Sequence, residues 1–341
     1  MHPFFRNMRH RAIVVISALA LLAFASLVMS GMIGSVPVPL ADMPGALMEL
    51  ASGDKGSLAA TLLDLRLSRA LVAFVTGAAL ALAGVMMQAL LRNPLADPYV
   101  LGISAGASVG ALAALLFMYA MWVVDAAAFV GAVTVSMMLY LLARRDLRGG
   151  TAAEGGSSVL LLTGVILSSG CMAMVTLMLS IAPESRLRSM IFWMIGDLSG
   201  APLRAIPWVV LAFGLLFALR SARSLNILAL HAEAAATLGI RVGALRKGLF
   251  FASGLLTASA VTSAGSIGFV GLIVPHACRF ACGPDHRLLI PAATLAGGAF
   301  LVLADTLART VLAPQQLPVG VVTALIGAPV FLYQLHRLHR K

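Results

Sequence analysis

Long apolar runs separated by short polar segments make up most of this chain of 341 residues. A helix needs roughly 20 apolar residues to cross the hydrocarbon core of a bilayer. Runs near that length predict ten membrane-spanning helices, at 12–33, 67–91, 99–119, 122–143, 158–181, 206–219, 249–264, 272–282, 288–307 and 319–335. The pattern therefore predicts an all-α polytopic membrane protein, with residues 1–341 forming a single transmembrane domain.

The more polar segments between these runs differ in character. Segment 35–64 contains three prolines and is expected to be a loop. Segment 183–204 mixes arginine, aspartate and tryptophan with apolar residues, which favours a short interfacial helix. Segment 220–247 is basic, has apolar residues at helical spacing and is interrupted by Gly239. It predicts two short helices outside the bilayer; an amphipathic connector lying on the lipid surface is the alternative.

The composition supports a membrane location. Hydrophobic residues make up 60% of the chain and charged residues only 11%, whereas a soluble domain has about 25% charged residues. The net charge of +11 would suit a nucleic-acid partner, but lysine and arginine also gather in the cytoplasmic loops of membrane proteins. We therefore expect a lipid bilayer as the surroundings and no nucleic acid.

The distribution of basic residues gives the orientation. With ten spans and both termini in the cytoplasm, seventeen of the 24 Lys and Arg residues fall on the cytoplasmic side. The other seven fall on the outer side: Lys55, Arg66, Arg69, Arg186, Arg188, Arg204 and Arg309. This excess has the expected sign. The N-terminus resembles a signal peptide, but its long apolar run without a clear cleavage site predicts a retained first span.

Two parts of the chain resemble each other. Segments 65–84 and 245–265 have similar sequences, and each leads into a segment interrupted by glycine or proline. They lie five spans apart, so the two copies would cross the membrane in opposite directions, as in the inverted repeats of transporters.

Three arginines form a candidate docking site. Arg66 and Arg69 are three residues apart and share one face of a helix, and Arg309 is expected at the same outer rim. Planar guanidinium groups suit carboxylates on a soluble partner. The alternatives are snorkelling of Arg66 and Arg69 to the membrane interface, and an intrahelical pair of Arg309 with Asp305.

Candidate pathway residues lie near both sides of the membrane. Asn93 and Leu95 flank Pro94, which forces a turn at the cytoplasmic end of the second span. Ser157 and Ser158 suit a gate or simply the start of a helix. Near the outer mouth, Arg186 and Arg188 are possible contacts for an anionic cargo.

The chain offers little for metal binding or catalysis. His276 follows a proline, and its role is either a contact with the cargo or a hydrogen-bonded structural one. Cys171, Cys278 and Cys282 all lie in apolar runs and are expected to be small buried side chains. A metal site at Cys278 and Cys282 would need more ligands than His276 and His286 supply.

The chain also lacks an energy source of its own. It contains no GxxxxGK[ST] motif to cradle a nucleotide phosphate. It has no set of intramembrane carboxylates like that of a proton-coupled carrier, and no cluster of catalytic polar groups within the spans. We therefore expect a transporter and not an enzyme. Its energy comes from another subunit or from an ion gradient, and the missing carboxylates argue against the gradient.

Four stretches carry a resemblance to a known family. They are LRLSRALVAFVTGAALALAGVMMQALLRNPLADPYVLGISAGASVG at 65–110, NILALHAEAAATLGI at 226–240, GSIGFVGLIVPHACRFACGPDHR at 265–287 and LADTLARTVLAPQQLPVGVVTALIGAPVFLY at 303–333. In this order they resemble the permease subunits of the type II ABC importers for vitamin B12, ferric siderophores and haem.

The resemblance implies an assembly in a bacterial inner membrane. Two copies of the permease work with two cytoplasmic ATPases, which bind ATP and Mg, and with a periplasmic binding protein. The permease itself needs no cofactor. The fifth span would line the pathway where the two permeases meet.

The resemblance also implies roles for individual residues. Binding-protein docking falls on Arg66, Arg69 and Arg309, and the cytoplasmic gate on Asn93, Leu95, Ser157 and Ser158. ATPase coupling falls on segment 220–247, through Asn226, Leu230, His231, Glu233, Leu238 and Gly239.

The expected function is import by alternating access. The expected cargo is haem or another iron chelate such as a ferric siderophore, because Arg186 and Arg188 would attract haem propionates. A cobalamin importer of the same family is the alternative, followed by an ion-coupled secondary transporter.

Overall fold

The computed structural model describes residues 3–53, 56–148, 156–230 and 232–339. Those residues form thirteen α-helices and two short 3-10 helices, and none of them lies in a strand. In chain order the elements are α1 (Pro3–Met32), η1 (Leu40–Asp42), α2 (Met43–Ser52), α3 (Leu58–Leu91), η2 (Pro98–Leu101), α4 (Ile103–Leu116), α5 (Met121–Arg148), α6 (Gly156–Ile181), α7 (Glu184–Ile195), α8 (Ala205–Leu230), α9 (Ala232–Thr237), α10 (Val242–Ala264), α11 (Val270–Cys282), α12 (His286–Thr310) and α13 (Val319–His339).

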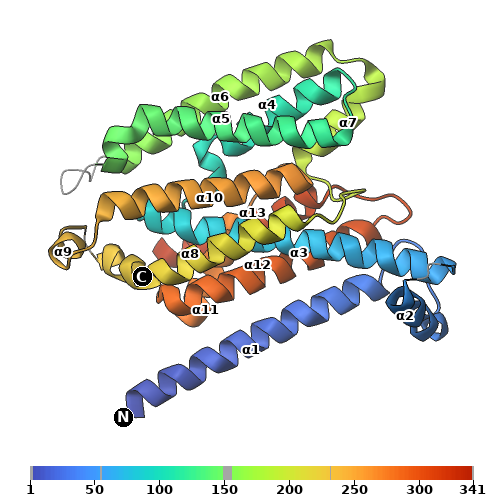
Figure 1. The fold of residues 1–341 in the computed structure, drawn as a ribbon, viewed down its shortest axis with the longest axis horizontal. Coiled ribbons are helices and arrows are strands. Elements are labelled where there is room, and N and C mark those ends of the chain that lie inside the picture. Colours follow the sequence, from blue (N-terminus) through green and yellow to red (C-terminus); the bar gives the residue numbers. More distant parts are fainter. Residues whose placement is uncertain (1–2, 54–55, 149–155, 231, 340–341) are drawn as a thin grey trace.

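Each of the ten predicted spans corresponds to one helix, so the all-α, ten-helix prediction is confirmed. These helices are α1, α3, α4, α5, α6, α8, α10, α11, α12 and α13. Among the described residues, six helices are long and apolar enough to cross a membrane by length and composition, and α4, α11 and α13 contain shorter apolar stretches. The long helices run roughly along one common axis (Figure 1).

The two ends of the bundle carry different short elements. Figure 1 shows both chain termini at the same end as α9, and α2 and α7 at the opposite end. This arrangement agrees with the prediction that both termini lie on one side of the membrane. Below, the end with α9 is called the inner end and the end with α7 the outer end.

Helix α3 is the centre of the bundle. In its most apolar window 89% of the residues are buried, against 17% in the corresponding window of α6. Glycines allow neighbouring helices to approach α3 closely. A Cβ atom added to Gly84 would overlap the carbonyl oxygen of Gly271 on α11. That oxygen has no amide partner one turn later in its own helix, because residue 275 is a proline.

The arrangement of α3 and α10 agrees with the predicted internal repeat. The two helices pack against each other and run in opposite directions along the bundle (Figure 1). Each leads through an irregular segment into a short helix, α4 after α3 and α11 after α10. Opposite directions are what an inverted repeat requires.

The predicted loop at 35–64 is partly wrong. It contains α2, whose first turn holds Pro44, a position that tolerates proline because the missing N–H would have no partner there. It also contains the first turns of α3, which begins at Leu58 and is capped by Ser57, whose hydroxyl accepts the N–H of Ala60 at 3.1 Å.

Candidate functional site

Asp305 is the hub of a polar cluster at the outer end. It lies on α12, and only 1% of it is exposed. Arg69 on α3 donates from Nη2 to Oδ1 at 2.8 Å and from Nε to Oδ2 at 3.0 Å. Arg309, one turn further along α12, places its Nε 3.2 Å from Oδ2 of the same carboxylate. Two guanidinium groups therefore share one buried carboxylate, and the cluster keeps a net positive charge.

Arg69 also connects the cluster to two outer loops. Its Nη1 donates to Oε1 of Gln316 at 2.8 Å and to Oγ of Ser199 at 3.2 Å. Gln316 lies between α12 and α13, and Ser199 lies between α7 and α8. Both are exposed, and Arg69 itself remains half-buried. Among the three arginines predicted to dock a binding protein, Arg69 is the most exposed.

The other two arginines serve contacts within the chain. Arg66 is 6% exposed and Arg309 is 4% exposed. Arg309 donates to the hydroxyl of Ser30 near the end of α1 at 2.7 Å. Arg66 donates to three backbone carbonyls at and after the end of α1, those of Gly31, Met32 and Val36.

These contacts give the three arginines different surroundings. The guanidinium groups of Arg66 and Arg309 hold the end of α1 against the bundle, whereas Arg69 also reaches the two outer loops. The intrahelical pair of Asp305 and Arg309, which the sequence offered as an alternative, is present. Docking of a binding protein stays a prediction.

Arg186 and Arg188 both lie on α7 at the outer end but differ in their contacts. Arg186 donates to the carbonyl of Leu116, the last residue of α4, where the helix dipole favours a positive charge. Arg188 is exposed, and its guanidinium lies 5.4 Å from the centre of the Phe192 ring, a cation–π contact. Their predicted contact with the cargo stays a prediction, and only Arg188 is exposed to solvent.

The turn after α3 contains the predicted gate residues Asn93 and Leu95. Arg92 ends the helix in the left-handed conformation, with φ of 50°, and the N–H of Asn93 reaches back to the carbonyl of Gln88 at 3.1 Å. Oδ1 of Asn93 accepts the N–H of Leu95 at 2.9 Å. The turn predicted from Asn93 and Pro94 is confirmed, and its role as a gate stays a prediction.

The chain then enters the bundle and meets the other interrupted segment. Oδ1 of Asp97 accepts the N–H of Tyr99 at 2.7 Å, and burial raises the pKa of Asp97 to about 6 despite that hydrogen bond. The hydroxyl of Tyr99 accepts the N–H of Ile267 at 3.1 Å. Ser104 and Ser266 join their hydroxyls at 2.7 Å. The two breaks of the internal repeat are therefore hydrogen-bonded to each other.

The second pair of predicted gate residues lies at the start of α6. Ser157 and Ser158 fall in its first turn, because α6 begins at Gly156. This agrees with their expected position at a helix start. Their side chains lie outside the described part of the chain, and their role as a gate stays a prediction.

The basic segment 220–247 differs from its prediction. The sequence predicts two separate short helices, but α8 continues without a break to Leu230 and α10 begins at Val242. The six-residue α9 lies between them. The physical reason is that residues 220–230 contain neither glycine nor proline, so nothing ends α8 at the membrane surface.

Gly239 ends α9 as the sequence indicates. Its φ is +80°, its N–H donates to the carbonyl of Ala236 at 3.0 Å, and the N–H of Ile240 donates to that of Ala235 at 3.0 Å. This pair of bonds is a Schellman motif. Leu228, Ala235 and Val242 form a small buried cluster beneath it.

Two of the predicted coupling residues are exposed at the inner end. Leu238 is 68% exposed and Gly239 is exposed beside it, so both are accessible to a partner at the inner end. His231 lies outside the described residues, as do the side chains of Leu230 and Glu233. Their coupling role stays a prediction.

Asn226 links α8 to the start of α12. Its Nδ2 donates to Oδ1 of Asp285 at 2.6 Å, and its Oδ1 accepts the backbone N–H of His286 at 2.9 Å. Burial acts to raise the pKa of Asp285, but hydrogen bonds from the N–H of Arg287 and from Asn226 outweigh it and lower that pKa. The amide of Asn226, predicted to couple to an ATPase, is thus engaged inside the chain.

His276 is packed inside the bundle. It is 4% exposed, and its ring meets that of Phe280 edge-on with 4.9 Å between the centroids. Neither ring nitrogen has a hydrogen-bond partner among the described residues. Phe280, one turn further along the helix, lines a cavity of about 640 Å³ between α11 and α13. Contact of His276 with the cargo stays a prediction.

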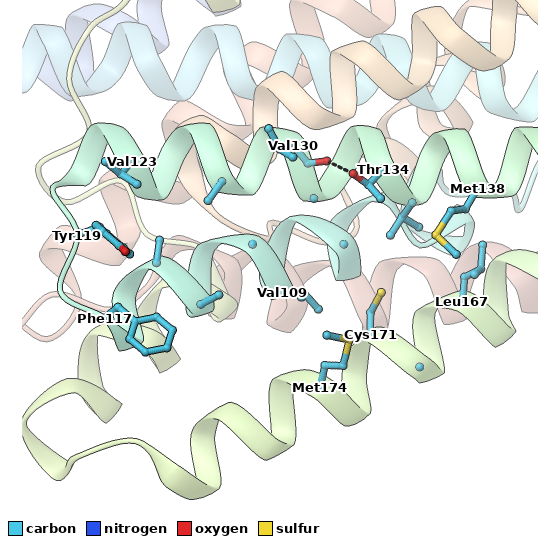
Figure 2. Close-up of a pocket in the computed structure, with 18 of the residues that line it drawn as sticks. Val109, Phe117, Tyr119, Val123, Val130, Thr134, Met138, Leu167, Cys171 and Met174 are labelled. Atoms are coloured by element: carbon cyan, nitrogen blue, oxygen red, sulfur yellow. Dashed lines mark hydrogen bonds between the residues drawn. The ribbon is translucent and has the colours of Figure 1, made fainter.

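An apolar cavity of about 720 Å³ lies between α4, α5 and α6. Figure 2 shows Val109 from α4, Val130 and Met138 from α5, and Cys171 and Met174 from α6 around it. The hydroxyl of Thr134 in its wall donates to the carbonyl of Val130 at 2.7 Å. Among the described residues, no charged side chain lines this cavity, and no three His, Cys, Asp or Glu side chains gather as a metal site.

Two features of the site were not predicted from the sequence. The bond between Arg69 and Asp305 joins residues 236 positions apart, although an acidic residue in an apolar run was a visible signal that a partner exists. The bond between Asn226 and Asp285 has no comparable signal, because both residues lie in polar stretches.

Comparison with known proteins identifies relatives of this chain. The model of the FecCD transport family matches residues 19–337. The cobalamin import system permease protein BtuC of Halobacterium salinarum is 42% identical over 276 residues, which cover 80% of this chain and 72% of that protein. The vitamin B12 import system permease protein BtuC of Escherichia coli O127:H6 is 40% identical over 282 residues, covering 81% of this chain and 84% of that protein.

Two solved structures resemble the fold of this chain over most of its length. A structure described as an inward-facing conformation of a metal-chelate type ABC transporter matches 95% of this chain and 99% of its own chain, with a TM-score of 0.82 and 29% identity. The PsaBC structure from Streptococcus pneumoniae matches 84% of this chain and 94% of its own, with a TM-score of 0.56 and 18% identity, which is a likeness of fold alone.

Proposed function

The chain belongs to the FecCD transport family, and we propose that it is the membrane permease of an ATP-binding cassette importer for cobalamin. A permease of this family is a multi-pass membrane protein, and ATP hydrolysis takes place in a separate subunit. The proposal places the chain in a bacterial inner membrane, with the end that carries α9 in the cytoplasm.

One observation carries the choice of cargo. Two permeases named for cobalamin or vitamin B12 import, one archaeal and one bacterial, are 40 to 42% identical to this chain over about four-fifths of its length. The sequence alone favoured haem, on the basis of Arg186 and Arg188. Arg186 is instead bonded to the end of α4, which weakens the argument for haem.

An iron chelate is the second candidate cargo. It is supported by the likeness to the metal-chelate type transporter, at 29% identity and a TM-score of 0.82. The uncharged wall of the cavity between α4, α5 and α6 offers no charged group that would choose between the two classes. We therefore assign selection of the cargo to a soluble binding protein.

The proposed partners fit different surfaces of the chain. A second copy would pack against α6, where Leu162, Ile166 and Leu177 are each 62% exposed. An ATPase would contact the inner end at Leu238 and Gly239. A binding protein with surface carboxylates would approach the positively charged cluster of Arg69, Arg309 and Asp305 at the outer end.

The contacts within the chain connect the two ends. Asn226 ties the inner end of α8, next to α9, to the first residues of α12. The same helix carries Asp305 at its outer end, bonded to Arg69. A displacement of α9 by an ATPase would therefore be passed along α12 to the outer cluster. We propose this route for alternating access, with the turn at Asn93 and Leu95 closing the inner side.

Competition for uptake tests the cargo. The permease, purified with its ATPase and binding protein and placed in liposomes, should take up labelled cobalamin when ATP is supplied. Excess unlabelled cobalamin should abolish the signal, whereas haem and a ferric siderophore should not. Uptake of labelled ferric siderophore instead of cobalamin would overturn the assignment in favour of the second candidate.

A further inference from the structure

A groove runs between α5 and α10 on the side of the bundle where α8 also lies. Two cavities, of about 340 and 230 Å³, follow each other along it and share the side chain of Leu255. Figure 1 shows α5, α10 and α8 next to one another on the near side, and α10 packs against both neighbours. The two cavities therefore form one continuous groove.

Each wall of the groove is one stripe of a helix. Residues four apart lie on the same face of an α-helix. The wall from α5 includes one such stripe, Asp125, Phe129, Val133 and Met137, and the wall from α10 includes another, Phe251, Leu255, Ser259 and Ser263.

The outer end of the groove is polar and charged. Nη2 of Arg204, just before α8, lies 2.5 Å from Oδ2 of Asp125, and their side chains are 36% and 14% exposed. Ser259 and Ser263 line the same cavity. Oγ1 of Thr262 is buried there without a hydrogen-bond partner among the described residues. A guanidinium, a carboxylate and several hydroxyl groups are therefore available to a ligand at this end.

The rest of the groove is apolar and open. Phe129, Val133, Met137, Phe251 and Leu255 are each between 36 and 44% exposed. Trp122 lies at the mouth and is 70% exposed, and tryptophan is enriched where a membrane meets water. From the outer end inward, the groove therefore runs from Trp122 at the mouth, past the charged pair of Asp125 and Arg204, to an apolar stretch.

The length of the groove matches one leaflet of a bilayer. Asp125 and Met137 are twelve residues apart on one helix, which corresponds to about 18 Å at about 1.5 Å per residue. Half of a hydrocarbon core of about 30 Å is about 15 Å. A lipid whose headgroup lies at Asp125 would place its acyl chain beside Val133 and Met137.

We propose that this groove binds one zwitterionic phospholipid of the leaflet at the outer end. Its phosphate binds Arg204, its ammonium group binds Asp125, and one acyl chain lies between α5 and α10. A guanidinium has five N–H donors, so Arg204 can bond a phosphate while it keeps its contact with Asp125. A purely anionic headgroup would bring no ammonium group to Asp125, and its phosphate would share the single guanidinium of Arg204 with that carboxylate.

The test measures the lipid that stays with the purified permease. Native mass spectrometry of the protein, extracted from liposomes of equal parts phosphatidylethanolamine and phosphatidylglycerol, counts bound lipids of each class. Leu255→Trp fills the wall that the two cavities share. Leu216→Trp on α8 is the matched control, because Leu216 is 45% exposed against 44% for Leu255 and lines neither cavity. Arg204→Gln removes the phosphate contact, and Arg204→Lys keeps the charge.

The expected result is one phosphatidylethanolamine per wild-type permease. Its binding should weaken by about tenfold or more in Arg204→Gln, as for the loss of a charged hydrogen bond, and it should be lost in Leu255→Trp. Leu216→Trp and Arg204→Lys should retain it. Equal retention in Leu255→Trp and wild type would overturn the site, and a preference for phosphatidylglycerol would overturn the zwitterionic assignment. A disulfide-linked dimer of Val133→Cys in intact membranes would show that a second copy covers this side instead.

Discussion

The Asp305 carboxylate accepts two hydrogen bonds from Nε and Nη2 of Arg69, at 3.0 and 2.8 Å, across the interface of α12 and α3. Because 89% of the most apolar window of α3 is buried, this contact fixes the outer end of α12 to the centre of the bundle. A buried ion pair holds a specific geometry more than it adds to stability. Its loss should therefore affect both the folding and the outer surface of the permease.

Replacing Asp305 with alanine should destabilise the protein strongly. The change leaves Arg69 and Arg309 without their shared carboxylate in a buried site, and breaking a buried pair from one side costs about 3–5 kcal/mol. Thermal unfolding in detergent should show a large fall in midpoint for Asp305→Ala. Glu184→Ala, at an exposed position that begins α7, serves as the control and should unfold like wild type. An unchanged midpoint for Asp305→Ala would contradict the assigned role of the carboxylate.

The crossing of α3 and α11 should not tolerate a side chain at Gly84. A Cβ there would overlap the backbone of Gly271, so the helices must move apart, and overpacking of this kind costs about 1–3 kcal/mol. Gly170→Ala on α6 is the control, since a Cβ at that position meets nothing within 4 Å. Thermal unfolding should rank Gly84→Ala below wild type and Gly170→Ala at or above it. The reverse order would be incompatible with this crossing.

Substitution of Gly239 by proline should separate ATP hydrolysis from transport. Proline fixes φ near −65°, whereas Gly239 has φ of +80° and donates its N–H to Ala236. The end of α9 must then change shape while the outer end remains as it was. Hydrolysis by the assembled complex should continue, uptake in liposomes should fall, and binding-protein association should be unchanged.

A second glycine provides the matched control for that experiment. Gly53 ends α2 with φ of +78° at the opposite end of the bundle (Figure 1). Gly53→Pro should leave ATP hydrolysis coupled to uptake. If Gly239→Pro abolishes binding-protein association and keeps coupling, then α9 lies on the wrong side of the membrane in our account.

Asp97 should make the stability of the permease depend on pH. Burial raises its pKa to about 6 in the folded protein, above the ordinary value of 3.8. The folded protein therefore binds this proton more tightly than the unfolded chain does, and stability falls as the pH rises from about 4 to about 6. The loss at neutral pH is at most about 3 kcal/mol.

The variant Asp97→Asn isolates that effect. Asparagine keeps an acceptor for the N–H of Tyr99 but carries no charge, so the variant should be more stable than wild type at pH 7.5. The difference between the two proteins should shrink toward pH 4.5 in thermal unfolding experiments. If the midpoint of the wild-type protein instead rises with pH over this range, relative to the variant, the predicted effect of Asp97 is contradicted.

The sequence was informative wherever a local pattern decides the structure. Apolar runs of sufficient length gave the ten helices, and the Asn93-Pro94 and Gly239 breaks gave the turns that follow α3 and α9. The sequence did not show that α8 continues past the membrane to Leu230, because its polar residues are all compatible with a helix. The sequence also did not show α2, because its first turn contains a proline, a residue that would end a helix at most other positions.

The directions of side chains were harder to predict than the helices. The face that Arg66 presents depends on where α1 ends, which brings three carbonyls to its guanidinium from more than 29 residues earlier in the chain. The acid at Asp305 could be recognised as a group in need of a partner, but its main partner, Arg69, is 236 residues away. Such long-range pairing follows from packing and not from local spacing.

The energy source of transport tests the central claim most directly. Liposomes that contain the permease and its ATPase, supplied with cobalamin-loaded binding protein on the outside, should accumulate cobalamin only when ATP is present inside. Replacing ATP with a non-hydrolysable analogue should stop accumulation, and dissipating ion gradients with ionophores should not. Accumulation that continues without ATP and stops when the ion gradients are removed would contradict the account.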